Sequence, residues 1–68
     1  MDRSELIKKI DEKIIGPDAE RDRKILKRRL IDGIRFEPLA EEFGLSVRWV
    51  KFIVYKRQGL IFEKRIDP

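Results

Sequence analysis

Apolar residues recur every three or four positions along most of the chain, which is the spacing of amphipathic helices. No segment shows the strict apolar and polar alternation of a half-buried strand. The first apolar stripe consists of Leu6, Ile7, Ile10 and Ile14. Asp2, which precedes this stripe, is a suitable N-cap for it. The pattern therefore predicts an all-α fold of four short helices.

Glycine and proline mark where these helices are expected to begin and end. Gly16 is expected to end the first helix, and Pro17 suits the first position of the second. The second helix is expected to run to about Asp32, with Gly33 as its stop. Its buried side is predicted to be defined by Leu26 and Leu30, with Arg21, Lys24 and Arg28 on the opposite side.

Residues 36–57 match two short helices that meet at a tight turn. Gly44 can adopt the left-handed backbone conformation of a helix stop, and Ser46 is a good N-cap for the helix that follows. Ala40 is small enough to let that helix approach closely. The positions that satisfy the helix-turn-helix pattern together are Leu39, Ala40, Phe43, Gly44, Leu45, Val50 and Ile53. A packed helical hairpin without DNA function would show the same pattern.

Length and composition narrow the class of protein. With 68 residues, the chain is expected to be a single helix-turn-helix domain over residues 1–68. Charged residues make up 44% of it, and its longest apolar runs are far too short to span a membrane. It contains no cysteine or histidine, so a disulfide framework, a metal site and the usual nucleophile and base pairs are not expected. We therefore expect a cytoplasmic protein that has no cofactor and is not an enzyme.

The positive charge is segregated along the chain. Residues 21–35 carry seven basic and two acidic side chains, and residues 46–59 carry four basic and no acidic ones. Such blocks can build a face that attracts phosphates, although they also fit an ordinary solvated helix surface. The predicted phosphate contacts are Arg21, Lys24, Arg28, Arg35, Lys56 and Arg57.

The stretch from Pro17 to Arg57 resembles region four of bacterial sigma factors and the small sigma-like helix-turn-helix proteins of phages and mobile elements. The segments that carry the resemblance are ERDRKILKRRLIDG and LAEEFGLS. The resemblance implies that residues 46–57 form a recognition helix that enters the major groove near promoter elements. In that family the recognition helix is typically rich in arginine, glutamate and glutamine, so the DNA preference cannot be transferred to this chain. Nothing in the chain resembles the sigma region that melts promoters and grips polymerase, so a complete sigma factor is not expected.

The exposed side of the predicted recognition helix should carry its contacts with DNA. Arg48 is the first candidate for reading guanine, because its guanidinium can donate two hydrogen bonds to O6 and N7. The predicted base contacts are Ser46, Val47, Arg48, Lys51 and Phe52. These assignments predict sequence-specific binding of double-stranded DNA by a small transcriptional regulator or a sigma-like accessory protein.

Aromatic residues on the same helix support a second interpretation. Trp49, Phe52 and Tyr55 could form a protein interface that binds RNA polymerase or another host factor. The apolar residues 60–62 could pack on the first helix or contribute to a homodimer. The sequence leaves open the target site, the oligomeric state and the choice between activation and repression.

Overall fold

A computed structural model describes residues 2–62 of the protein. This part of the chain forms four helices and no strand, which confirms the predicted all-α class. The helices are α1 (Arg3–Lys13), α2 (Ala19–Leu30), α3 (Phe36–Phe43) and α4 (Val47–Phe62). None of these helices is long and apolar enough to cross a membrane.

Local sequence signals explain where α1 begins and where α2 ends, but not where α2 begins. The side chain of Asp2 accepts a hydrogen bond from the Glu5 backbone N–H at 2.9 Å, as expected of an N-cap. The prediction that Pro17 is the first residue of α2 is wrong, because the Ala19 N–H donates to the Gly16 carbonyl and closes a turn that contains the proline. Gly33, with a φ of 72°, follows the end of α2 as predicted.

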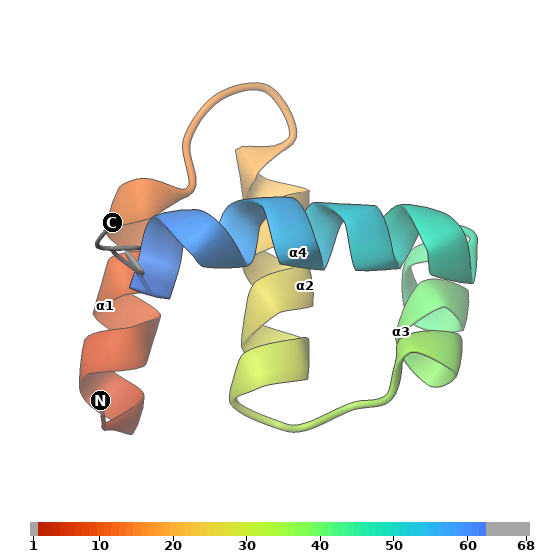
Figure 1. The fold of residues 1–68 in the computed structure, drawn as a ribbon, viewed down its shortest axis with the longest axis horizontal. Coiled ribbons are helices and arrows are strands. Elements are labelled where there is room, and N and C mark those ends of the chain that lie inside the picture. The colour runs from red at the N-terminus through yellow and green to blue at the C-terminus, as the bar shows by residue number, and fades with distance from the viewer. Residues whose placement is uncertain (1, 63–68) are drawn as a thin grey trace, which may run out of the picture.

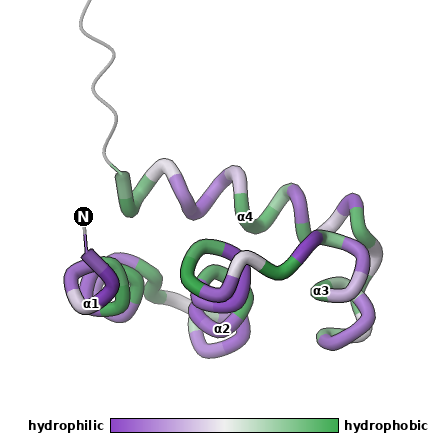
Figure 2. Tube along the Cα trace, turned by 90° about the horizontal axis from the view of Figure 1, so that it is seen from below, coloured by the Kyte–Doolittle hydropathy of each residue, from purple (hydrophilic) through white to green (hydrophobic). Residues whose placement is uncertain are grey.

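Three helices form a row, and α4 lies across it. Figure 1 shows α1 and α2 running antiparallel, with α1 and α3 on opposite sides of α2. Helix α4 crosses all three at a steep angle and packs against each of them, as Figure 2, which looks down the axes of α1, α2 and α3, also shows. One side of α4 is therefore buried on the row, while the other points away from it.

The core occupies the layer between α4 and the row. Each helix contributes side chains that are at most 4% exposed, namely Ile10, Ile25, Leu26, Leu39, Ala40, Val50, Ile53, Val54 and Ile61, and the C-cap residue of α1, Ile14, joins them. Burial of Ala40 agrees with the prediction that a small residue is needed where α3 and α4 approach each other. Ile61 is fully buried near the end of α4, so one of the three apolar residues at positions 60–62 belongs to the core.

A tight turn joins α3 to α4. Gly44 has a φ of 66°, and its N–H donates to the Glu41 carbonyl, while the Leu45 N–H donates to the Ala40 carbonyl at 2.9 Å. This pair of bonds is the Schellman arrangement that satisfies the last carbonyls of a helix. The Ser46 hydroxyl then accepts from the Trp49 N–H at 3.1 Å and caps α4. The predicted glycine stop and serine cap are both confirmed.

Candidate nucleic-acid interface

The side of α4 that points away from the other helices is the candidate interface. Val50, Ile53 and Val54 face the core, so at about 100° per residue the opposite side of the helix carries Arg48 and Phe52. We call this surface the outer face of α4 and define it by Arg48, Trp49, Lys51, Phe52, Tyr55, Lys56 and Gly59. All of these residues are exposed, with Trp49 at 46%, Phe52 at 51% and Tyr55 at 60%.

The outer face carries positive charge and no negative charge of its own. Helix α4 contains no aspartate or glutamate among its 16 residues. Within residues 2–62, the Arg48 side chain has no ion-pair or hydrogen-bond partner. Lys56 lies with its Nζ atom 5.5 Å from the centre of the Phe52 ring. In the described part of the chain, neither cation is paired with a carboxylate.

The aromatic residues of the outer face form two ring contacts. The rings of Trp49 and Phe52 are stacked, with centroids 5.2 Å apart and planes 20° from parallel. Tyr55 makes an edge contact with Phe36 of α3, with ring centroids 5.9 Å apart. The guanidinium of Arg29 lies 4.3 Å from the centre of the Phe36 ring, a cation–π contact that joins the end of α2 to the start of α3. Sequence analysis did not find this role of Phe36.

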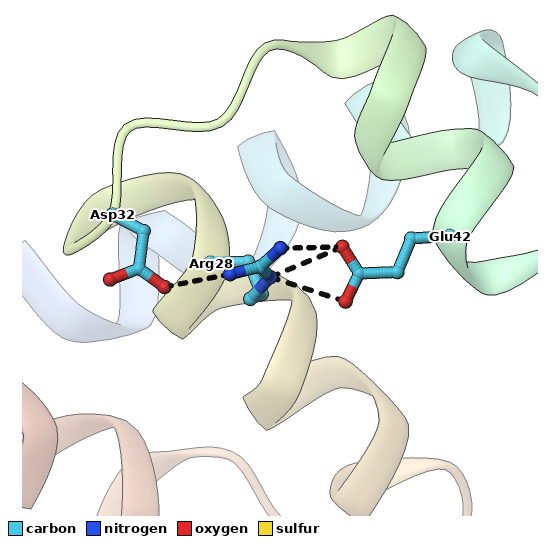
Figure 3. A network of polar contacts seen from close by, with 3 residues as sticks. All are labelled: Arg28, Asp32 and Glu42. Carbon is cyan, nitrogen blue, oxygen red and sulfur yellow. Dashed lines mark hydrogen bonds and ion pairs between the residues drawn. The ribbon is translucent and has the colours of Figure 1, made fainter.

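Arg28, one of the predicted phosphate contacts, is held by two carboxylates. Figure 3 shows its guanidinium between Asp32 on one side and Glu42 of α3 on the other. Its nitrogens donate to both carboxylate oxygens of Glu42 at 2.9–3.1 Å and to Asp32 at 3.2 Å. The hydrogen bonds with Glu42, reinforced by its charge, raise the pKa of Arg28 above its usual value. A phosphate at this position would have to compete with these two carboxylates.

Arg57 is also paired, although it too was predicted to contact phosphate. Its Nε atom donates to Asp22 at 3.1 Å, and the Asp22 side chain is only 4% exposed. Arg21 approaches the other oxygen of the same carboxylate at 3.0 Å. Asp22 therefore joins α2 to α4 through a partly buried charge pair. No sequence signal pointed to it, because its partner lies 35 residues away.

The remaining predicted contacts lie on different parts of the chain. Ser46 is exposed at the helix start, where its hydroxyl acts as the cap, whereas Val47 is half-buried against the core. Lys24 is exposed and lies 3.9 Å from Glu20. Arg35 is exposed immediately before α3.

A hollow between the start of α2 and the outer face of α4 brings together three of the predicted phosphate contacts. They are Arg21, Lys56 and Arg57, and the rings of Trp49 and Phe52 line the same hollow. The carboxylates of Asp18 and Asp22 also border it, so the positive and negative groups there partly offset one another. Residues 2–62 contain no group of three or more acidic side chains arranged to hold a metal ion. The chemistry available at this surface is therefore electrostatic attraction, hydrogen-bond donation and aromatic contact.

Comparisons of the chain with models of protein families, with curated proteins and with solved structures found no match. The resemblance to sigma region four consequently remains a prediction that rests on the sequence segments quoted above.

Proposed function

We propose that this protein binds double-stranded DNA in a sequence-specific manner, with α3 and α4 acting as a helix-turn-helix and α4 as the recognition helix. The observation that carries the proposal is the outer face of α4, which is exposed along its length and bears cations but no acidic residue. A major groove about 12 Å wide admits one helix of this kind. A role as a small transcriptional regulator or a sigma-like accessory protein fits this activity.

The arrangement of the other helices supports entry of α4 into a groove. The row of α1, α2 and α3 lies on one side of α4 only, so nothing in the described part of the chain covers its outer face (Figure 2). The starts of α2 and α3 lie on opposite sides of α4 (Figure 1). Arg21 near the start of α2 and Arg35 before α3 are thus placed to approach the phosphates of the two strands that border a groove.

The proposed contacts divide by their chemistry. Arg48 is assigned to a guanine edge, and Lys51 and Phe52 to neighbouring bases, because all three project from the exposed side of α4. Arg21, Lys24, Arg35 and Lys56 are assigned to phosphates. Arg21 also pairs with Asp22 and Asp18, but these carboxylates belong to the start of its own helix and not to another helix. Arg28 and Arg57 are assigned to the fold instead, because each is already bound by a carboxylate of another helix.

The experiment is a titration of a fluorescently labelled duplex at several salt concentrations, followed by fluorescence anisotropy. Four phosphate contacts correspond to a slope of about −3.6 in log affinity against log salt, or a loss of roughly 150-fold between 50 and 200 mM salt. Lys24→Ala should reduce the slope by about one, whereas Arg48→Ala should relax sequence preference. The matched control is Lys8→Ala, which removes an exposed cation from the side of α1 opposite its buried residue Ile10. It should change neither the salt slope nor the sequence preference. Absence of duplex binding at low salt would refute the proposal.

A second candidate function follows from the exposed aromatic residues. Trp49, Phe52 and Tyr55 are each about half exposed, and exposed aromatic side chains are enriched at protein interfaces. In this alternative the domain binds RNA polymerase or another host factor through the outer face of α4. The double variant Phe52→Ser/Tyr55→Ser should then abolish the complex, while Lys24→Ala leaves it intact. The opposite pattern would eliminate the alternative.

A further inference from the structure

The stacked rings of Trp49 and Phe52 are not explained by attraction to phosphates. They occupy the exposed side of α4 beside Arg48, where a purely polar surface would serve electrostatic binding equally well. We propose that this aromatic stack reads the 5-methyl group of thymine in the major groove. This inference rests on the proposed function and names the base that the stack selects.

The chemistry of the groove identifies the methyl as the target. Among the four bases, thymine alone presents a methyl group on the major-groove edge. The other groups that the bases present there are hydrogen-bond donors and acceptors. A phenyl ring makes no conventional hydrogen bond and gains most by covering an apolar group. Phe52 is 51% exposed, so half of its surface is available for such a contact.

The stack also holds the reading residue in place before DNA arrives. Trp49 covers one side of the Phe52 ring at a centroid distance of 5.2 Å, and the Lys56 ammonium lies 5.5 Å from the ring centre. These two contacts restrict the rotamers of Phe52 and so reduce the entropy that it loses on binding. The edge of the ring that these neighbours leave uncovered is the part that can meet a methyl group.

Charge around the stack favours DNA over a protein as its partner. Lys56 lies over the Phe52 ring, and Arg48 lies on the same exposed side of α4, which supplies no carboxylate. Asp18 and Asp22 at the start of α2 border the hollow beside the rings, where Arg21, Lys56 and Arg57 outnumber them. A polyanion that also offers apolar methyl groups matches both properties of this surface. Phe52 follows Arg48 by four residues, or about 6 Å along the helix. Since stacked base pairs are about 3.4 Å apart, the thymine should lie within about two base pairs of the guanine that Arg48 contacts.

The test begins with selection of a binding site from random duplexes, followed by replacement of each thymine by deoxyuridine, which removes only the methyl. For the wild-type protein, deoxyuridine at one or two positions near the Arg48 contact should weaken binding about fourfold per methyl, equivalent to about 0.8 kcal/mol. Phe52→Ala should bind the selected duplex more weakly and should no longer distinguish thymine from deoxyuridine. Leu60→Ala removes another exposed apolar side chain of α4 and should retain the full discrimination.

The possible outcomes test the methyl contact separately from DNA binding. Equal affinity of the wild-type protein for thymine and deoxyuridine at every position, or a selected site without thymine, would overturn the methyl contact while leaving DNA binding established. No binding to any duplex at low salt would overturn both this inference and the proposed function. Phe52→Leu keeps an apolar side chain but removes the ring, so it should lose most of the discrimination if the stack positions the contact. Full discrimination in this variant would overturn the role of the stack, because it would show that an apolar side chain alone reads the methyl.

Discussion

Replacing Arg57 by methionine separates two roles that this residue could have. The substitution keeps an apolar stem of similar length and removes the guanidinium, so Asp22 loses the hydrogen bond that joins α2 to α4. A phosphate-contacting arginine would affect DNA affinity and leave stability unchanged. The structure predicts the reverse, because the guanidinium is already bound to a carboxylate that is 4% exposed.

The size of the effect follows from the burial of the pair. A hydrogen bond to a charged group contributes about 1.5–3 kcal/mol. The Arg57 side chain is 22% exposed, so solvent screens the pair, and Arg21 continues to neutralise the carboxylate. Both facts place the loss in the free energy of unfolding at about 1.5–2 kcal/mol, the lower part of that range. For a domain of this size, the corresponding fall in Tm is about 6–16 °C.

Thermal and urea unfolding followed by circular dichroism measure this loss. Lys56→Met, at the neighbouring exposed position, is the matched control and should change stability by less than about 0.5 kcal/mol. Asp22→Asn tests the other side of the pair, and the double variant Asp22→Asn/Arg57→Met should be less destabilised than the sum of the two single variants.

Two results would refute this account of Arg57. The first is an unchanged Tm in Arg57→Met, which would mean that the pair with Asp22 does not contribute to stability. The second is a variant that is fully folded at the assay temperature but loses duplex affinity as strongly as Lys56→Met does. That result would return Arg57 to the phosphate contacts predicted from sequence.

The other predictions concern the turn, the cap and the core. Gly44→Ala should destabilise the fold by about 1–2 kcal/mol because of its positive φ, whereas Gly59→Ala, in a helical position with open space around it, should stabilise it by about 1 kcal/mol; urea unfolding compares the two. An equal effect of both substitutions would contradict this reasoning. Ser46→Ala removes the cap of α4 and should cost about 1 kcal/mol, measured in the same way; an unchanged unfolding midpoint would argue against the cap bond. Leu39→Ala empties a fully buried site and should cost about 2–5 kcal/mol, so circular dichroism should show a largely unfolded chain at 37 °C; a cooperative transition near the wild-type Tm would argue against the described core.

Local features of the sequence were sufficient to predict the all-α class, the start of α1, and the turn between α3 and α4. Asp2, Gly44 and Ser46 act on backbone groups within a few residues of themselves, so their effect can be inferred from spacing alone. The exposed side of α4 was predictable for a similar reason. Val50, Ile53 and Val54 mark the buried stripe, and the helical repeat then places Arg48 and Phe52 opposite.

The turn before α2 and the length of α4 were less accessible to local reasoning. Pro17 is compatible both with a first helical position and with a turn, and only the hydrogen bond from Ala19 to Gly16 decides between them. Gly59 disfavours a helix locally, yet α4 continues to Phe62. Burial of Ile61 near the end of α4 supplies a tertiary reason for that continuation.

Tertiary structure decided that Arg28 and Arg57 are bound by carboxylates of other helices. By composition, Arg28 and Arg57 are indistinguishable from the other cations of the two basic blocks. Their partners Glu42 and Asp22 lie 14 and 35 residues away in the chain, so no local pattern could pair them. The helical repeat specified the face on which each side chain lies, whereas the charge that this face presents to a partner depends on contacts that form only when the helices pack together.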